Sequence, residues 1–274
     1  MVFPLRVSQS IKEKIILVIV LIITFIIFFP IYWIIIGSFK STVDFISPTP
    51  KFVFSPTLVN YKLALERTLI LPAMKNSLIV GLSSLLLGLL LGIPAAYIFS
   101  KFNFSHKNDL KFWILSLRFM PPIAVVIPFY DMWISIGLYD TYIALIITYL
   151  LISLPLIIWL MSDYFANIPK EIEEAAMIDG CSLFQTFYKI SIPLAIPGII
   201  SVGLFSFVLL WNEFFIAFVL TTRNITLPVA VAASSKFGME IPWGQLCAEI
   251  VILIIPSLIF ASLFRKVIKS LVIK

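Results

Sequence analysis

The sequence of 274 residues has little of what metalloenzymes and disulfide-rich proteins are built from. It contains one histidine, His106, and two cysteines, Cys181 and Cys247. So few imidazole and thiol groups argue against a metal site, a Ser-His-Asp catalytic set and a disulfide framework, and we expect both cysteines to be reduced or inert. None of the ten glycines belongs to a GxxxxGKS or GxxxxGKT phosphate-binding loop, so the chain is not expected to bind ATP by itself. The sequence therefore predicts a protein that is not an enzyme.

Charge is also scarce, and apolar residues take its place. Only 12% of the residues are charged, 61% are apolar, and the mean hydropathy is +1.10. A soluble domain is roughly 45–50% apolar and about 25% charged, because its surface must stay wetted. The composition therefore excludes a soluble enzyme, a disordered chain and a disulfide scaffold, and it predicts a membrane protein.

Six runs with few or no charges are long enough to cross a membrane, since a spanning helix needs about 20 mostly apolar residues. They predict helices over residues 15–39, 76–100, 112–136, 141–162, 197–220 and 244–264. The first run is too long for a signal-peptide core and is expected to be retained. Prolines inside the runs are expected to kink the helices: Pro30, Pro94, Pro121, Pro122, Pro155 and Pro256. The pattern predicts one all-α transmembrane domain over residues 1–274.

The basic residues that flank these runs predict the orientation. Connections on the side of the two termini carry more Lys and Arg than those on the other side, which favours cytoplasmic termini. This topology also explains the net charge of +6. The positive balance therefore does not indicate a nucleic-acid partner.

The inner loop at residues 163–196 differs from the rest of the chain because it is amphipathic and acidic. Pro169 can open a helix, and the glutamates after it suit the positive end of the helix dipole. Gly180 fits the left-handed residue that ends a helix, and Ser182 with Gln185 forms a capping box for a second one. The loop predicts a helix–glycine–helix element outside the bilayer, with a small apolar face for a partner's groove.

Seven residues of this loop follow a specific spacing: Glu174-Ala175-Ala176, then Gly180, Ile190 and Ile192-Pro193. The pattern resembles the EAA loop of permease subunits of binding-protein-dependent ABC importers, although the usual pattern has leucine where this chain has Ile192. Further motifs look like the carbohydrate-uptake branch, and in particular the six-span maltose-type permeases: Arg118-Phe119-Met120-Pro121, Gly137-Leu138-Tyr139-Asp140-Thr141, Leu154-Pro155, Ile168-Pro169 and Trp211-Asn212.

The resemblance implies a non-catalytic membrane subunit of a sugar importer in the cell membrane of a prokaryote. Implied partners are a second permease subunit, two cytoplasmic ATPase subunits that bind ATP and Mg²⁺, and an external solute-binding protein. No cofactor is implied in this chain. The EAA loop would be the coupling helix that docks into the ATPase, which assigns that role to Glu174, Ala175, Ala176 and Gly180, with Asp179 adjacent. The outer loop at residues 221–243 would contact the binding protein.

Few ionisable groups lie inside the predicted spans, and Glu213 is the deepest of them. Trp211 and Asn212 precede it, and sugar recognition combines hydrogen-bonding groups with aromatic faces. We therefore predict that Trp211, Asn212 and Glu213 line the translocation path, with hydrogen bonding between helices as the alternative for Asn212 and Glu213.

Two other functions are considered. One is a permease for a non-sugar solute, such as a phosphodiester, an amino acid or a polyamine. The other is an autonomous channel or secondary carrier. The EAA spacing argues against the second, and the paucity of ionisable groups in the spans argues against proton coupling.

Overall fold

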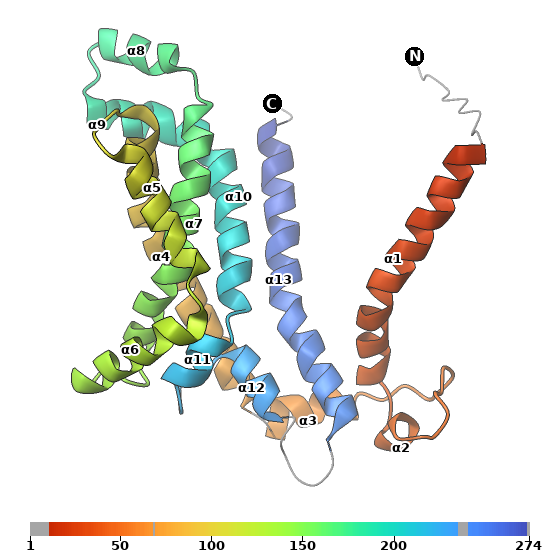
Figure 1. The fold of residues 1–274 in the computed structure, drawn as a ribbon. Helices are drawn as coiled ribbons and strands as arrows, with labels where there is room; N and C mark the ends of the chain where they lie inside the picture. The colour runs from red at the N-terminus through yellow and green to blue at the C-terminus, as the bar shows by residue number, and fades with distance from the viewer. Residues whose placement is uncertain (1–10, 68, 235–240, 273–274) are drawn as a thin grey trace. The chain divides into compact units, whose positions relative to one another are not determined.

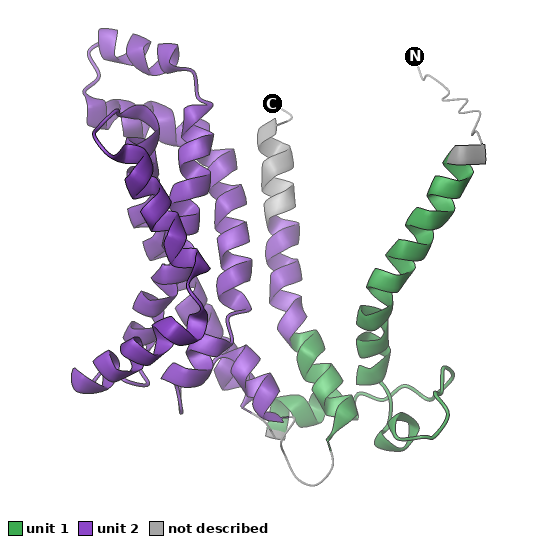
Figure 2. Ribbon diagram, in the orientation of Figure 1, with its two compact units in different colours: residues 1–67, 235–252 green, residues 68–234, 253–274 purple. Residues whose placement is uncertain are grey.

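The computed structural model describes residues 11–67, 69–234 and 241–272, and within these ranges the chain is helical and contains no strand (Figure 1). The chain divides into two compact units. The described part of unit 1 comprises residues 11–67 and 241–252, and that of unit 2 comprises residues 69–234 and 253–272 (Figure 2). The last helix, α13 (Trp243–Val272), passes from unit 1 into unit 2. That the whole chain acts as one transmembrane domain stays a prediction.

The described part of unit 1 contains three further helices, α1 (Ile11–Ser38), α2 (Thr42–Phe45) and α3 (Val59–Arg67). Side chains along most of α1 are exposed, as expected for a helix whose neighbours are lipid or another subunit. The end of α1 is held by Asn60 of α3, whose Nδ2 donates to the carbonyl oxygens of Ser38 at 2.9 Å and Lys40 at 2.7 Å. These bonds satisfy carbonyls that would otherwise be without a partner beyond the helix end.

Unit 2 is organised around two long helices, α4 (Ile70–Lys101) and α7 (Tyr142–Ala166). A Cβ atom added at Gly92 would lie 2.6 Å from Ile157 Cγ2, and one added at Gly88 would lie 3.0 Å from Ile157 Cδ1. Glycine therefore permits the close approach of α4 to α7. The spacing of Gly81, Gly88 and Gly92, seven and four residues apart on one helix face, predicts that another helix can approach this face closely.

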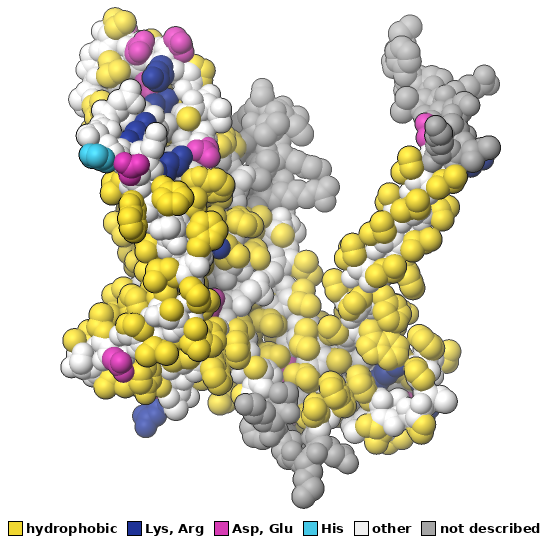
Figure 3. Space-filling model, viewed as in Figure 1, with side chains coloured by type: hydrophobic (Ala, Val, Ile, Leu, Met, Phe, Trp, Pro, Cys, Tyr) yellow, Lys and Arg dark blue, Asp and Glu magenta, His cyan; other side chains and the backbone are white. Residues whose placement is uncertain are grey.

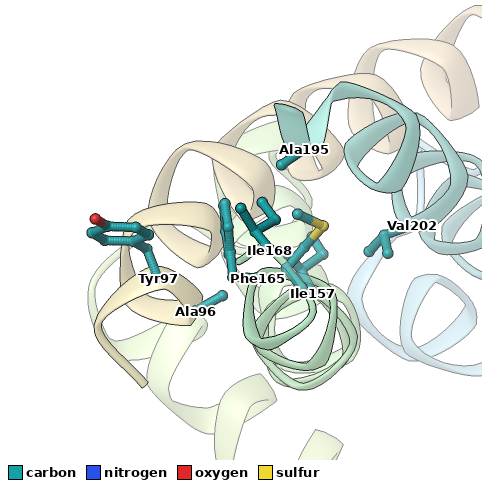
Figure 4. Packing of buried hydrophobic residues seen from close by; sticks show 8 residues of the cluster. Ala96, Tyr97, Ile157, Phe165, Ile168, Ala195 and Val202 are labelled. Carbon is teal, nitrogen blue, oxygen red and sulfur yellow. The ribbon is translucent and has the colours of Figure 1, made fainter. Parts of the chain in front are cut away.

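Helix α10 (Ile192–Trp211) packs against both α4 and α7. The three helices, together with Ile168 just after α7, form a buried apolar cluster (Figure 4) that consists of Ala96, Tyr97, Ile157, Met161, Phe165, Ile168, Ala195 and Val202. At one point α10 approaches α7 closely, because a Cβ atom at Gly198 would lie 2.5 Å from the ring of Tyr164. This cluster fixes the end of unit 2 from which the acidic loop projects.

Five described helices are long and apolar enough to cross a membrane, or six if one bent pair counts as a single span. The all-α membrane fold is thus confirmed, but two predicted spans are not continuous helices. The third consists of α5 (Lys107–Ser116) with the 3₁₀ turn η1 (Leu117–Phe119), then α6 (Pro122–Ser135), bent by 90°. Pro121 and Pro122 explain the break, since each lacks an amide hydrogen and restricts the residue before it.

The fifth predicted span, residues 197–220, is also interrupted. Helix α10 starts five residues earlier, at Ile192, and ends at Trp211, and α11 (Phe215–Leu220) follows after a break. The short helix α12 (Leu227–Ser234) lies in the loop predicted to face outward. Residues 235–240 of that loop lie outside the described residues.

Candidate coupling loop and membrane pocket

The acidic loop is built around helix α8 (Lys170–Ile178), which begins directly after Pro169. Figure 1 shows α8 and the short helix α9 (Leu183–Thr186) at one end of unit 2. Figure 3 shows Lys, Arg, Asp and Glu side chains gathered at this end, next to a mostly hydrophobic surface. Glu171 and Glu173 lie in the first turn of α8, where the helix dipole favours carboxylates.

The five residues predicted to couple to an ATPase subunit lie on an accessible surface. Glu174, Ala175, Asp179 and Gly180 are exposed, and Ala176 is half-buried. The side chain of Ile178 next to them is 86% exposed. A large apolar side chain among small residues suits a surface that is covered by a partner. The coupling role of these residues stays a prediction.

Both helix ends in the loop have the predicted caps. Gly180 has a φ of +91°, the amide of Gly180 donates to the carbonyl of Met177, and the amide of Cys181 donates to that of Ala176. This pair of bonds is a Schellman motif. Ser182 and Gln185 form both hydrogen bonds of the capping box. The helix–glycine–helix element is therefore confirmed.

Glu173 forms a buried ion pair that the sequence did not predict. Its Oε2 lies 3.2 Å from Nζ of Lys101 at the end of α4, and both side chains are only 7% exposed. Its Oε1 accepts a hydrogen bond of 2.7 Å from the hydroxyl of Ser191. Lys101 also donates to the carbonyl of Ile168 at 2.9 Å. A buried carboxylate with these partners ties α8 to two membrane helices.

Ser191 reaches Glu173 from an unusual segment. Residues Phe187–Ser191 form one turn of π-helix between α9 and α10. Such turns are rare and occur mostly as single inserted turns in α-helices, frequently at functional sites. Glu173 itself immediately precedes the EAA glutamate, Glu174, which points to the exposed face instead. No local pattern pairs Glu173 with a lysine on a distant helix, so only the tertiary structure reveals the contact.

Glu213 lines a cavity of about 470 Å³ in unit 2. Arg118 lines the same cavity, and every other lining side chain is apolar. Arg118 lies in η1 beside the bend of the third predicted span, and Glu213 lies in the break between α10 and α11. The structure thus brings together the two charged groups that lie at the two helix breaks.

The other two residues predicted for the translocation path lie differently. Trp211 is buried, and its Nε1 donates to the carbonyl of Leu253 at 3.0 Å. Asn212 is exposed and donates to the carbonyl of Val208 in its own helix. Neither residue lines the cavity. A translocation role for this stretch therefore depends on Glu213, whereas the observed contact of Trp211 is packing between α10 and α13.

Asp140 fixes the start of the loop at residues 221–243, which is predicted to contact the binding protein. The carboxylate of Asp140 accepts hydrogen bonds from the backbone amides of Thr222, Arg223 and Asn224, at distances between 3.0 and 3.2 Å. Asp140 itself has a φ of +59°. This residue belongs to the Gly137–Thr141 motif singled out in the sequence, and its contacts join the connection before α7 to the connection after α11.

A family model described as "binding-protein-dependent transport system inner membrane component" matches residues 84–273. The chain is 36% identical to a trehalose/maltose transport system permease protein of Thermococcus litoralis over 245 residues, 88% of each chain. It is 34% identical to a trehalose transport system permease protein of Mycobacterium tuberculosis over 244 residues, 86% of this chain and 87% of that one.

Among solved structures, the fold is similar to a chain of a bacterial ABC transporter involved in the import of the acidic polysaccharide alginate. The TM-score is 0.79 at 23% identity, and the match covers 97% of this chain and 99% of the other. At this identity the likeness concerns the fold, and it agrees with the all-α membrane architecture described above.

Proposed function

The chain belongs to the family of binding-protein-dependent transport system inner membrane components, and we propose that it is a permease subunit of an ABC importer for sugars or oligosaccharides. In this function it forms half of a translocation pathway and contains no catalytic site of its own. The two relatives described above carry trehalose or maltose transport in their names, which supports a carbohydrate as the transported solute.

The observation that carries the proposal is the accessible helix α8, anchored to the membrane helices through Glu173. Its exposed residues follow the EAA pattern, and its buried glutamate contacts Lys101 of α4 and Ser191 before α10. A force on α8 is therefore transmitted to two long helices through short polar contacts. This arrangement suits a coupling helix that an ATPase subunit moves.

We assign Glu174, Ala175, Ala176, Asp179 and Gly180 to the docking surface for the ATPase. ATP and Mg²⁺ bind to two such partner subunits, and closure of the ATPase pair turns the pathway from inward-open to outward-open. A second permease subunit completes the pathway. Both termini and α8 lie in the cytoplasm in this proposal, and the membrane is the cell membrane of a prokaryote.

The loop at residues 221–243 faces the other side, where it contacts the solute-binding protein. In agreement with this topology, Figure 1 shows α8 and α12 at opposite ends of unit 2. The three amides held by Asp140 give the start of this loop a defined position, which favours a docking surface over a plain connection.

The proposal is tested with the importer reconstituted in proteoliposomes with its partner permease, ATPase subunits and binding protein. We expect ATP hydrolysis to be stimulated when the binding protein carries a sugar from a panel that includes maltose and trehalose. Glu174→Lys should abolish this stimulation while the complex still assembles. Asp109→Lys is a control, because it also replaces an exposed carboxylate with lysine but lies outside α8. Stimulation by amino acids or polyamines and by no sugar would contradict the proposal.

A further inference from the structure

Two helix breaks in unit 2 meet at one cavity. The first lies between η1 and α6, where the chain bends by 90°, and the second lies between α10 and α11. Residues from both breaks line the cavity of about 470 Å³, which is within the range of roughly 300–1,000 Å³ found for ligand pockets. Broken helices inside a membrane protein are tolerated where they line a cavity, and transporters place substrate sites there.

Each break contributes one charged side chain to this cavity. Nη1 of Arg118 donates to the carbonyl of Ile152 at 2.8 Å, which orients the guanidinium group. A guanidinium group has five N–H donors in a fixed fork, so this bond leaves others for a ligand. Oε1 of Glu213 accepts the amide hydrogen of Ile216 at 2.8 Å, which orients the carboxylate. Among the described residues Arg118 forms no ion pair.

We propose that Arg118 and Glu213 form a subsite for a neutral sugar ring within this chain. The inference rests on the proposed function and specifies where this subunit contacts the transported solute. Hydroxyl groups donate and accept hydrogen bonds, so one ring can bind both a guanidinium donor and a carboxylate acceptor. An anionic ligand would be attracted by Arg118 and repelled by Glu213. A cationic ligand would be attracted by Glu213 and repelled by Arg118. The opposite charges therefore disfavour a ligand with a net charge, and an uncharged polyhydroxylated ligand can bind both groups.

The rest of the lining fits the same ligand. Phe129 presents an aromatic ring to the cavity wall, and Pro122 and Leu209 add aliphatic surface. A sugar ring has apolar C–H faces as well as hydroxyl groups, and binding sites combine an apolar lining with a few placed polar groups. The two orienting bonds hold the polar groups in position before the ligand enters, which lowers the cost of binding.

The first experiment measures sugar uptake and binding-protein-stimulated ATP hydrolysis in proteoliposomes that contain the complete importer. Glu213→Gln is nearly isosteric and Arg118→Lys keeps the charge, so both variants should assemble. We expect each to reduce trehalose or maltose uptake by roughly tenfold or more, as for the loss of a charge-assisted hydrogen bond. Stimulated ATP hydrolysis, measured in the same vesicles, reports whether the coupling loop, which neither substitution touches, still responds to the binding protein. Asp131→Asn is the control, since Asp131 lies on α6 outside the cavity lining.

The second experiment detects binding without transport. Leu209→Cys is introduced into a chain that carries Cys181→Ser and Cys247→Ser, and the thiol is labelled with a cationic thiosulfonate reagent. Trehalose or maltose should slow the labelling, and Glu213→Gln should remove this protection. Ile136→Cys at the end of α6 is an exposed site outside the lining, where the sugar should have no effect.

The outcomes separate the two proposals. If the wild-type importer transports no sugar, the proposed function is wrong. If it transports sugar, and both variants transport it equally well without sugar protection of the thiol at position 209, the subsite is wrong while the function stands. If Glu213 only stabilises the packing of the helices, Glu213→Gln should lower assembly and the labelling should be insensitive to sugar, which also contradicts the subsite.

Discussion

The ammonium group of Lys101 lies 3.2 Å from the carboxylate of Glu173, and both side chains are almost completely buried. The pair joins the last residue of α4 to the first turn of α8. Lys101 at the end of α4 also has a favourable interaction with the helix dipole. This contact connects a helix exposed to the cytoplasm in our proposal with the helix that packs most extensively against α7.

We expect Glu173→Ala to uncouple ATP hydrolysis from transport more strongly than it affects assembly. Removing one partner of a buried ion pair typically costs about 3–5 kcal/mol, because the other charge is left without compensation. Here the cost falls on the attachment of α8, so its backbone amides should exchange hydrogen faster. Hydrogen exchange and sugar-stimulated ATP hydrolysis of the complete importer measure the two effects.

A double variant in which the two charges exchange positions provides the control for this prediction. Lys101→Glu combined with Glu173→Lys keeps opposite charges at the same two positions, and it should recover part of the coupling that either single variant loses. A double variant as defective as the singles, or Glu173→Ala with wild-type exchange in α8, would show that the ion pair does not hold the helix.

Gly180→Ala should weaken coupling through the backbone alone. Gly180 has a φ of +91°, and a Cβ atom there would meet no atom within 4 Å, so the substitution introduces strain and no clash. A left-handed conformation costs a residue with a Cβ atom roughly 1–2 kcal/mol. Part of this strain is relieved if the end of α8 unwinds, which hydrogen exchange of residues 175–181 would detect.

Gly137→Ala is a matched control for this substitution. Gly137 has a φ of +72° and also no neighbour within 4 Å of its Cβ position, but it lies in the connection between α6 and α7. The two substitutions should cost similar free energies of unfolding, whereas only Gly180→Ala should reduce sugar-stimulated ATP hydrolysis. An equal loss of sugar-stimulated ATP hydrolysis in both variants would mean that general backbone strain, and not a change at the end of α8, is responsible.

Gly92→Ala should destabilise the pairing of α4 with α7. The added Cβ atom would lie 2.6 Å from Ile157 Cγ2 in the buried cluster, and overpacking of this kind typically costs about 1–3 kcal/mol. The thermal transition of the purified subunit complex in detergent is the measurement. Gly81→Ala is the control, because its nearest neighbour is a ring atom of Phe207 at an ordinary 3.7 Å.

A second variant keeps the Gly92 prediction specific. Ile157→Ala removes the atom that the new methyl group meets. Gly92→Ala should therefore cost less stability in a chain that carries Ile157→Ala than it does in the wild-type chain. Strictly additive losses would show that Gly92 and Ile157 are not in contact, since energetic coupling is expected only for neighbouring side chains.

Asp140→Asn should loosen the start of the loop at residues 221–243. The carboxylate accepts bonds from three consecutive amides, and hydrogen bonds to a charged group contribute about 1.5–3 kcal/mol when buried and less in water. The amides of residues 222–224 should exchange faster, and stimulation by the binding protein should fall. Wild-type exchange at these amides would contradict the role of Asp140. Asparagine is chosen because it tolerates the observed positive φ.

Several features were predictable because they depend on neighbouring residues. The caps at Gly180 and at Ser182 follow from rules that span a few positions, and the structure contains both. The spacing of Gly88 and Gly92 also predicts a close approach by another helix, which the structure shows to be α7. The broken third span was only partly predictable. Pro121 and Pro122 indicate a kink. The length of an apolar run, however, does not specify a bend of 90°.

The sequence by itself determined that this chain is an all-helical membrane protein with a capped, acidic helix–glycine–helix loop, because composition, apolar run length and capping depend on residues close together in the chain. Only the tertiary structure decided that Glu173 pairs with Lys101, that Arg118 and Glu213 line one cavity, and that Trp211 lies in the packing. These contacts join residues on different helices, and their partners are set by how the helices pack and where they break.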